Sequence, residues 1–352
     1  MAALGDIDLG WRPATAEARE AELAALVYTS RATGAFDQSS LDSLIEAARS
    51  RNAAERVTGA VYYHDGRFLQ WLEGPLDSIK RIATSINRDD RHTDIEILSF
   101  GATLARVFAD SDMHLVMRRT DVPSALERFT GNGPSVSHGG PPLEAAIGLA
   151  EGDHAAAAAY LASSGEGLAE RVQSCEAIID AYAGLWASDV CGDLDITLGL
   201  CELLRLFRRL HRNVAPVGPA REGPSFLVAP YPYEPHHIGA ALASELLIDQ
   251  RRDVTYAFPR SDEEIIKQLE RARYGGVVLA LSGVYAREHL AGPIRRTAEG
   301  LQDRFGPGFR IVVYGRMGLK PPAELQDTGL YGCCCSANDL PLLLEPAEPV
   351  LH

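Results

Sequence analysis

The sequence predicts a multidomain α/β protein that combines a ferredoxin-like α+β domain, a helical bundle and a doubly wound, Rossmann-like parallel sheet. Three observations predict it. Residues 59–74 are typical of a strand hairpin, because an Asp-Gly pair separates two apolar runs. Residues 143–211 are rich in alanine and place apolar residues at helical spacing. From residue 225 onward, short apolar strands alternate with helices, which favours a parallel sheet.

Length and composition limit the classes of protein to consider. A chain of 352 residues exceeds one ordinary core, and 46% apolar with 23% charged residues is typical of globular proteins. The formal net charge of -14 argues against direct binding of nucleic acid. Neither a membrane-spanning run of about 20 apolar residues nor a signal peptide is found. Because the six cysteines form no CxxC pair, we expect free thiols and a cytoplasmic location.

The first domain is expected over residues 21–125, after a leader over residues 1–20. Ser39 or Ser40 is expected to cap its first helix, because a hydroxyl there can accept a hydrogen bond from the backbone. The elements return to one sheet, which is the ferredoxin-like arrangement. In chain order they are a strand over Leu23–Ser30, a helix to Asn52, strands over Val57–Tyr63 and Arg67–Glu73, a helix over Leu76–Asn87, and strands over Ile95–Phe100 and Met113–Met117.

A linker is expected over residues 126–142, because its Gly, Ser and Pro residues disfavour helices and strands. Three or four helices are expected in the segment that follows it. The later segments are a helical cap over residues 143–215, a parallel-sheet domain over residues 224–345 and a tail over residues 346–352. Ser261 and Glu264 form a capping box that predicts the start of one sheet-covering helix.

Gln70 is an unusual residue on the second arm of the hairpin. It shares one strand face with Phe68 and Leu72, because strand side chains alternate. A buried amide without partners costs roughly 1–3 kcal/mol, so Gln70 needs hydrogen bonds to a core group or to a ligand. The hairpin by itself favours a core glutamine bonded to backbone groups, whereas the flanking chain favours a ligand.

Tyr28, Asn52 and Gln70 together resemble the BLUF family of flavin-using blue-light sensors. The resemblance covers residues 21–118 and rests on a combination of motifs. These motifs are Thr58-Gly59, Phe68-Leu-Gln-Trp-Leu-Glu-Gly74 and Asp89-Asp-Arg-His92. The resemblance implies a noncovalently bound flavin, usually FAD, between the two helices. By resemblance, the flavin-binding residues are Tyr28, Ser30, Asn52, Gln70, Asp89, Arg91 and His92.

The resemblance implies a specific role in flavin binding for several of these side chains. Asn52 would both donate to and accept from the edge of the flavin ring, as a primary amide can. Arg91 and His92 would lie near the flavin, with Arg91 donating to a carbonyl oxygen. Asp89 would hold the ribityl end.

The photochemical residues implied by the resemblance are Tyr28, Gln70 and Met113. The Tyr28 phenol would lend an electron and a proton to the excited flavin. The Gln70 amide has a donor end and an acceptor end, so its rotation or tautomerisation would rearrange its bonds to Tyr28 and to the flavin. The family often carries a Trp two residues before the methionine, where this chain has Ser111. The identity of the readout side chain on the fifth strand is therefore open.

The loops after the first, third and fourth strands of the parallel sheet are expected to hold a site, because ligands bind beyond the carboxyl ends of such strands. No GxGxxG motif follows the first strand, which weighs against a dinucleotide. The spacing Glu234-x-His236-x-x-Gly239 resembles the acidic-x-His-x-x-Gly motif of cobalamin-binding domains. That family implies His236 as the axial metal ligand, Glu234 as the group that orients its ring, and Gly239 as a point of close approach.

The cobalamin resemblance extends to Ser282 and Gly283, where Ser282 would contact the nucleotide tail of the cofactor. It also extends to Gly315, which matches the first glycine of the Gly-Gly pair that the family carries after the fourth strand. Arg316 departs from that pair. Trp186, in the helical cap, would lie against the upper face of the macrocycle. Related modules hold heme, whose iron also takes an axial histidine, so the second cofactor is cobalamin or, alternatively, heme.

The order of domains resembles the AppA-type photoreceptor antirepressors of photosynthetic bacteria. This resemblance implies a sensory protein rather than an enzyme, with a transcriptional repressor or other regulator protein as its partner. It is compatible with a homo-oligomer. A cobalamin-dependent enzyme or a flavin oxidoreductase is the alternative of another class, although this length leaves no room for a substrate barrel. Cys333-Cys334-Cys335 is either a redox-active or metal-binding group or, as we expect, a buried or idle C-terminal loop.

Overall fold

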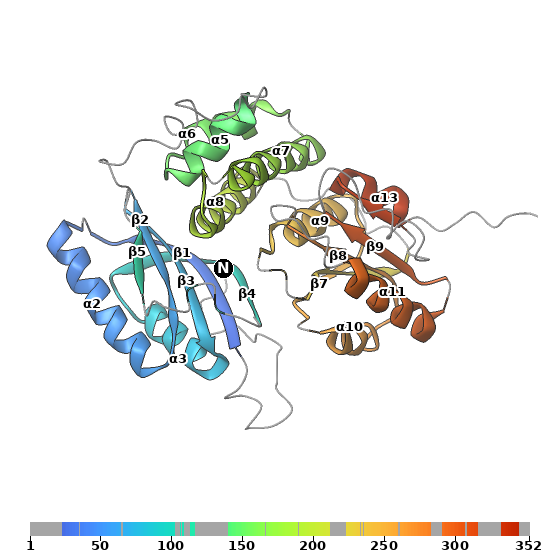
Figure 1. The fold of residues 1–352 in the computed structure, drawn as a ribbon, viewed down its shortest axis with the longest axis horizontal. Coiled ribbons are helices and arrows are strands. Elements are labelled where there is room, and N and C mark those ends of the chain that lie inside the picture. Colours follow the sequence, from blue (N-terminus) through green and yellow to red (C-terminus); the bar gives the residue numbers. More distant parts are fainter. Residues whose placement is uncertain are drawn as a thin grey trace, which may run out of the picture. The chain divides into compact units, whose positions relative to one another are not determined.

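The computed structural model divides the chain into two compact units, residues 1–122 and 123–352 (Figure 1). The residues that the structure describes are 23–34, 36–64, 66–102, 106, 108, 113–116, 140–165, 167–188, 190–211, 223–232, 234, 236–259, 261–282, 291–306, 308–315 and 332–344. Apart from residues 140–142, the predicted linker lies outside them, and so does Ser111.

The first unit is a sheet with two helices on one face. Its strands are β1 (Leu23–Ala32), β2 (Thr58–His64), β3 (Arg67–Pro75), β4 (His92–Ala102) and β5 (His114–Val116). They lie in the order β4-β1-β3-β2-β5, with antiparallel neighbours except for the parallel pair β2–β5. Helices α2 (Gln38–Ala54) and α3 (Leu76–Asn87) share an apolar core with the sheet. The order of elements agrees with the sequence prediction.

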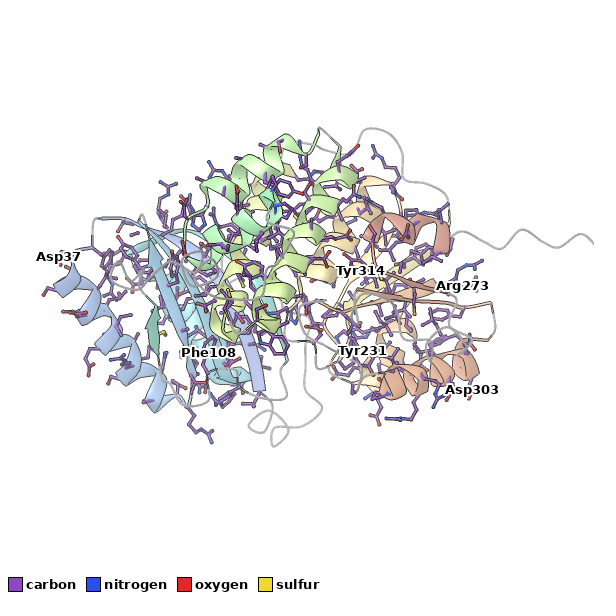
Figure 2. The ribbon with its side chains drawn as sticks, turned by 45° about the horizontal axis from the view of Figure 1, so that its top comes forward. Asp37, Phe108, Tyr231, Arg273, Asp303 and Tyr314 are labelled. Atoms are coloured by element: carbon purple, nitrogen blue, oxygen red, sulfur yellow. The ribbon has the colours of Figure 1, made fainter. Side chains whose placement is uncertain are left out.

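Helix α2 begins earlier than the sequence suggested. Asp37 lies just before its first residue (Figure 2) and caps it, with Oδ1 accepting a hydrogen bond from the Ser40 backbone N–H at 2.8 Å. The prediction of Ser39 or Ser40 as the cap was wrong, because both residues already lie within the first turn. A carboxylate at this position also complements the positive end of the helix dipole.

The register between β1 and β3 decides which side chains meet under the helices. Tyr28 lies opposite Gln70, and Leu26 lies opposite Leu72. Because strand side chains alternate, both pairs project onto the same face of the sheet. Tyr28, Leu26 and Leu72 belong to the core that α2 and α3 cover. A slip of one residue would turn this whole set to the other face, so burial of the leucines also fixes Tyr28 beside Gln70.

The opposite face of β3 carries a second polar cluster. The Trp71 Nε1–H donates to Glu73 Oε1 at 2.8 Å, and the Phe108 backbone N–H donates to Glu73 Oε2 at 3.0 Å. The Phe108 ring meets the Trp71 ring edge-on, with centroids 6.0 Å apart. The Glu73 carboxylate thus ties β3 to the chain that follows β4.

The predicted helical cap opens the second unit. Its described helices are α5 (Pro141–Ala150), α6 (Ala155–Ser163), α7 (Leu168–Ala187) and α8 (Asp193–His211). Pro141 and Pro142 start α5 rather than end a linker, because proline is tolerated in a first turn, where N–H groups lack acceptors within the helix. None of the helices described here or below is long and apolar enough to cross a membrane.

A parallel sheet forms the rest of the second unit. Its strands are β6 (Ser225–Pro230), β7 (Val254–Tyr256), β8 (Tyr274–Ala280), β9 (Arg310–Tyr314) and β10 (Gly332–Cys334), in the order β10-β9-β8-β6-β7. Its helices are α9 (Ile238–Asp249), α10 (Asp262–Leu269), α11 (Ala291–Phe305) and, after a 3-10 turn η2 (Ala337–Asp339), α13 (Leu340–Leu343).

Alternate residues of β6 enter two different cores, as a sheet covered on both faces requires. Phe226 and Val228 share a core with α9 and the helical cap, whereas Leu227 packs with α10 and α11. Ser261 caps α10 as predicted, with Oγ accepting from the Glu264 backbone N–H at 3.3 Å. This is the doubly wound arrangement that the strand and helix alternation predicted.

The cysteine run adds a strand that the sequence did not predict. Cys333 and Cys334 lie in β10, which pairs with β9 in parallel. The expectation of a loop was wrong, because three identical residues carry no period from which a strand can be recognised. Cys334 is buried, which agrees with the other part of the expectation. Among the described residues, no group of three or more His, Cys, Asp and Glu side chains is placed to hold a metal ion.

One carboxylate on α7 connects the helical cap to the sheet. Glu176 Oε1 accepts from the Tyr314 hydroxyl at 2.8 Å and from the Ala337 backbone N–H at 2.7 Å. Its Oε2 accepts from the Ser336 hydroxyl at 2.8 Å. Tyr314 ends β9 (Figure 2), so these bonds join α7 to the carboxyl end of the sheet.

Candidate functional site

A pocket opens in the first unit between α2 and the segment that joins α3 to β4. It opens to solvent at its mouth and is lined by side chains from α2, β2, β3 and the chain around the end of α3. Its walls combine seven apolar side chains with five polar or charged ones. They are formed by Leu44, Ile45, Ala47, Ala48, Arg51, Val61, Phe68, Gln70, Ile86, Asp89, Arg91 and His92. Gln70, Asp89, Arg91 and His92 are the predicted flavin residues among them.

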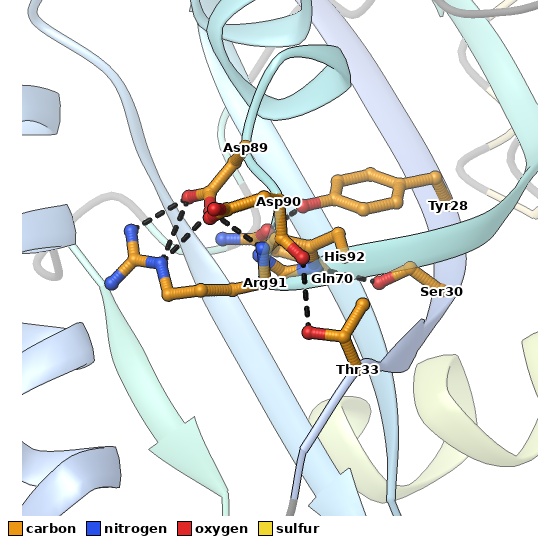
Figure 3. A network of polar contacts seen from close by, with 8 residues as sticks. All are labelled: Tyr28, Ser30, Thr33, Gln70, Asp89, Asp90, Arg91 and His92. Atoms are coloured by element: carbon orange, nitrogen blue, oxygen red, sulfur yellow. Dashed lines mark hydrogen bonds and ion pairs between the residues drawn. The ribbon is translucent and has the colours of Figure 1, made fainter.

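Tyr28, Gln70 and Met113 form a chain of hydrogen bonds. The Tyr28 hydroxyl donates to Gln70 Oε1 (Figure 3), and Gln70 Nε2 donates to Met113 Sδ at 3.5 Å. All three side chains are buried. A thioether is a weak acceptor, so the donor end of the amide is held less firmly than the acceptor end. The structure therefore brings the three predicted photochemical residues into contact.

The environment of the Tyr28 phenol keeps it protonated, so that it can donate a hydrogen bond. Burial raises its pKa above the usual range, the positive charge of Arg51 opposes the rise, and the negative charge of Asp89 adds to it. Burial outweighs the attraction to Arg51 because a phenolate would lose its hydration inside the core. The phenol is therefore protonated at neutral pH and can hold Gln70 in one orientation.

Ser30 and His92 form a second polar contact under α2. The Ser30 Oγ lies 2.9 Å from the His92 Nδ1 (Figure 3). The His92 ring packs against the Phe68 ring, with centroids 5.0 Å apart. Burial lowers the pKa of His92, and the Asp89 carboxylate opposes that shift. A neutral imidazole at this place keeps one ring nitrogen as an acceptor.

Asp89 and Arg91 are paired with each other at the pocket rim. The Arg91 guanidinium donates from Nη2 to Asp89 Oδ2 at 2.6 Å and from Nε to Asp89 Oδ1 at 2.9 Å. This two-pronged contact lowers the pKa of Asp89 to about 2. The Thr33 hydroxyl donates to the Asp90 carbonyl at 2.9 Å and fixes the same turn (Figure 3). The resemblance implied that Arg91 and Asp89 contact different parts of the flavin, whereas in this structure the two side chains bind each other.

The end of α2 carries the predicted Asn52 and a residue that the sequence analysis missed. Asn52 is fully buried, and its backbone oxygen accepts from the Val57 N–H at 2.8 Å where the chain passes towards β2. Arg51 lines the pocket. Leu44, Ala48 and Arg51 are four and three residues apart, so they share one helix face. That spacing is the sequence signal that placed Arg51 on the same side of α2 as two apolar pocket residues.

These residues fit a flavin. Ile45, Val61 and Phe68 offer apolar surface for the faces of a flat ring. Gln70 and the Asp89–Arg91 pair bring amide, carboxylate and guanidinium groups to its edges. Cofactor sites commonly combine apolar walls with polar groups that fix the orientation of the ligand.

In the second unit, the predicted axial histidine and its acidic neighbour are buried after β6. Glu234 and His236 are each 5% exposed. The His236 backbone N–H donates to Glu234 Oε1 at 3.2 Å, so the carboxylate fixes the loop that carries the histidine. Ser282, which follows β8, is 3% exposed, and its Oγ has no hydrogen-bond partner among the described residues. A buried hydroxyl in that state can bind a polar ligand group.

Two of the predicted glycines are explained by packing within the protein. A Cβ on Gly239 would lie 2.6 Å from the Leu281 carbonyl oxygen, and a Cβ on Gly315 would lie 2.5 Å from the same oxygen. Gly315 also has a φ of +122°, which disfavours other residues. The close approach is therefore between α9, β9 and the end of β8. Gly283 and Arg316 lie outside the described residues.

Trp186 and His237 both pack against neighbours within the second unit. Trp186, at the end of α7, is half-buried and packs against the core of the helical cap. His237, next to His236, packs against the Phe258 ring with centroids 4.9 Å apart. Burial lowers the pKa of His237 to about 4. His237 is therefore neutral at pH 7 and serves as a natural comparison for His236.

Residues 23–114 match the family described as BLUF, sensors of blue-light using FAD. Photoactivated adenylate cyclase subunit beta of Euglena gracilis is 31% identical over 96 residues, which are 27% of this chain and 11% of the relative. The blue light- and temperature-regulated antirepressor BluF of Escherichia coli (strain K12) is 31% identical over 108 residues, 30% of this chain and 27% of the relative. The chain thus spans only a minor part of each of these relatives.

Two solved structures are similar to parts of this chain. The dark-state structure of BlrB, a BLUF protein, is 31% identical and covers 32% of this chain and 87% of that one, with a TM-score of 0.28. A cobalamin-binding protein from Desulfitobacterium hafniense is 12% identical and covers 56% of this chain and 94% of that one, with a TM-score of 0.30. Scores of this size carry no conclusion about a ligand. By the family match, residues 23–114 are a BLUF domain, a flavin-binding sensor of blue light.

Proposed function

We propose that the chain is a blue-light sensory protein in which the Gln70 amide is the switch and the second unit passes the signal to a regulator protein. The position of Gln70 carries this proposal. Its amide accepts from Tyr28 at one end and donates to Met113 at the other. One side chain thus connects a photochemically competent phenol to the start of the edge strand β5.

FAD supplies the absorption of blue light and a ring that can accept an electron. The Tyr28 hydroxyl holds a proton directed at Gln70 Oε1. If the amide reverses, the group that faces Met113 becomes the amide or imidic oxygen in place of the N–H donor. The Met113 sulfur has no proton to give, so a reversed amide loses this contact. A photochemical change in the hydrogen bond between Tyr28 and Gln70 would thereby release the Met113 side chain from Gln70.

Strand β5 is suited to respond to that release. It pairs with β2 over only 3 residues, at the edge of the sheet. The Arg49 Nε–H donates to the Met113 carbonyl at 3.1 Å, which is a second attachment of the same residue, to α2. Short edge strands open locally at low free-energy cost, so the loss of one of a few contacts shifts their equilibrium most. We therefore assign the light-dependent movement to β5.

The central test is the absorption spectrum of the flavin-loaded chain. Blue light should shift the flavin band to longer wavelength, with recovery in the dark, and Gln70→Leu should abolish the shift. Met113→Leu is the matched variant: it should keep the shift but remove the light-induced change in amide hydrogen exchange of β5. A persistent red shift in Gln70→Leu would overturn the switch, and an unchanged exchange response in Met113→Leu would overturn the output through β5.

A second cofactor is proposed for the second unit, cobalamin or alternatively heme, with His236 as the axial ligand. The buried Ser282 hydroxyl supports it, because that group has no hydrogen-bond partner among the described residues and follows the strand beside β6. Cobalamin and heme should each be added to the purified chain and to two variants. His236→Ala should remove the spectrum of axial ligation, and His237→Ala should preserve it. The reverse result, or equal binding by both variants, would refute His236 as the ligand.

We propose protein contact, rather than catalysis, as the output. The antirepressor among the relatives supports this, and a net charge of -14 favours a basic partner, such as a DNA-binding regulator. The cyclase relatives match this chain over about a hundred residues only. Illuminated protein incubated with ATP should form no cyclic AMP; light-dependent formation of cyclic AMP would overturn the proposal.

A further inference from the structure

The face of β3 opposite the pocket carries a carboxylate that fastens the chain between β4 and β5. Glu73 is fully buried. Its Oε2 accepts from the Phe108 backbone N–H at 3.0 Å, and its Oε1 accepts from the Trp71 indole N–H at 2.8 Å. The Phe108 ring also meets the Trp71 ring edge-on. Phe108 is therefore held to the sheet both by its backbone and by its side chain.

Arg106 fastens the same stretch of chain at a second point. Its Nη1 donates to the Thr58 hydroxyl oxygen and to the Glu73 carbonyl oxygen, each at 2.7 Å. Its Nη2 donates to the Arg56 carbonyl oxygen at 2.6 Å, in the turn after α2. Thr58 and Glu73 lie opposite each other in the register of β2 and β3. We call Arg106 and Phe108 together the outer anchor.

The outer anchor is attached more firmly than strand β5. Hydrogen bonds to a charged oxygen are stronger than those between neutral groups, and a buried carboxylate that loses a partner is costly. Strand β5, in contrast, pairs with β2 over only 3 residues, and Gln70 reaches the Met113 sulfur at 3.5 Å. A perturbation that reaches both attachments should therefore open β5 first and leave Phe108 in place.

We propose that Glu73 is a positioning residue of the switch, which holds Phe108 in place while β5 moves and so keeps Met113 close to Gln70 for the return to the dark state. The inference rests on the movement of β5 proposed above and names what limits it. Met113 follows Phe108 by five residues and Arg106 by seven, but it follows the end of β4 by eleven. The outer anchor thus shortens the chain that must close to restore the contact.

The length of this chain predicts the effect on the dark recovery. The entropy lost on closing a chain segment grows with the logarithm of its length, so the probability of closure falls with about the 3/2 power of the length. Loss of the Phe108 attachment leaves Arg106 as the nearest fixed point and should slow recovery by about 1.7-fold. Loss of both attachments should slow it by about 3-fold.

Four variants test these factors in the flavin-loaded chain. Phe108→Pro removes the backbone N–H and the ring, whereas its control Phe108→Ala removes only the ring. Arg106→Gln is made alone and together with Phe108→Pro. After a pulse of blue light, the return of the flavin band is followed in the dark.

A second pair of variants tests the carboxylate itself. Glu73→Gln replaces one accepting oxygen by a donating amide group. Glu46→Gln is the control, because it makes the same change of net charge at an exposed position of α2. For this pair, amide hydrogen exchange is measured at single residues in the dark and under light, in addition to the recovery of the flavin band.

All variants should keep the size of the red shift. Phe108→Pro and Glu73→Gln should each recover about 1.7-fold more slowly, and Phe108→Pro with Arg106→Gln about 3-fold more slowly. Phe108→Ala, Glu46→Gln and Arg106→Gln alone should recover like the unsubstituted chain, because Phe108 remains the nearest fixed point. The Phe108 amide of the unsubstituted chain should exchange slowly in the dark and under light, while the β5 amides exchange faster under light.

Any of three results under light would overturn the proposal: unchanged recovery in both Glu73→Gln and Phe108→Pro, equal slowing in Phe108→Ala and Phe108→Pro, or a light-induced exchange at Phe108 as large as that in β5. A fast-exchanging Phe108 amide in the dark would overturn it whether or not the flavin responds to light. Absence of a red shift would instead contradict the proposed function, and the dark exchange of Phe108 would still decide on the anchor. Phe108→Pro keeps the test valid if Glu73→Gln does not fold, because Phe108 lies outside the strands.

Discussion

In the first unit three buried side chains form a chain of hydrogen bonds, with Tyr28 bonded to Gln70 and Gln70 to Met113. In the second unit Glu234 holds the His236 backbone, but the Ser282 hydroxyl is buried with no partner among the described residues. When every group in a chain of hydrogen bonds already has a partner, the chain can respond to light only by exchanging partners, and a switch operates in this way. A group without a partner gains a bond when a ligand arrives, which is how a binding site operates.

The pattern of glycines sharpens this comparison, because it shows where the second unit is tightly packed. Gly239→Ala would place a methyl group 2.6 Å from the Leu281 carbonyl oxygen, whereas a methyl group on Gly300, within α11, would have no neighbouring atom within 4 Å. We expect Gly239→Ala to destabilise the second unit by about 1–3 kcal/mol. Gly300→Ala should instead stabilise it by up to about 1 kcal/mol, because alanine favours helices. Calorimetry without added ligand measures both effects, and equal stabilities would contradict the packing explanation of Gly239.

The contact of Glu176 with the sheet provides the next largest expected effect. Glu176→Gln replaces an oxygen that accepts from Tyr314, Ser336 or Ala337 by an amide group that donates. A donor facing a donor costs about 1–3 kcal/mol when partly buried. Glu170→Gln, on an exposed face of α7, is the control. Urea denaturation should separate the two variants, and a light-induced flavin shift should survive in both, because the first unit does not use Glu176.

The pH dependence of the second unit should reflect His237. Its pKa is about 4 in the folded chain, below the usual value of about 6.5, so the unfolded state binds the proton first as pH falls. The stabilising effect of its neutral form is complete above pH 6.5 and is lost as pH falls to 4. In His237→Gln the urea midpoint of unfolding should depend less on pH between 6.5 and 4 than in the unsubstituted chain. A midpoint that declines equally in both proteins would show that other groups cause it.

The first unit should lose stability in a more acidic window and by a smaller amount. The pKa of Asp89 is about 2 in the folded chain, below its unfolded value of about 3.9. The Asp89–Arg91 pair therefore stabilises the fold fully above pH 4 and progressively less as pH falls towards 2. The effect is small because Arg91 is half exposed. Asp89→Asn should remove this dependence and leave that of His237 unchanged, as measured by urea midpoints at each pH.

Local patterns predicted most of the fold and part of the first site. The hairpin and the α3 helix were predicted because alternation and helical spacing are properties of neighbouring residues. The Asp37 cap was missed, since Asp37, Ser39 and Ser40 lie within one turn and each can serve as a cap. Strand β10 was missed because its pairing with β9 depends on residues far away in the chain. Arg51 was missed because helical spacing alone does not distinguish a ligand-facing arginine from a solvated one.

The sequence by itself determined which residue types could form a light switch: a phenol, an amide and a thioether at positions 28, 70 and 113. Only the tertiary structure decided how they meet. The β1–β3 register puts Tyr28 opposite Gln70, and α2 adds the charge of Arg51 to the same pocket. The physical reason is that hydrogen bonds and pKa values depend on distance and burial, which arise when segments separated in the sequence pack into one core.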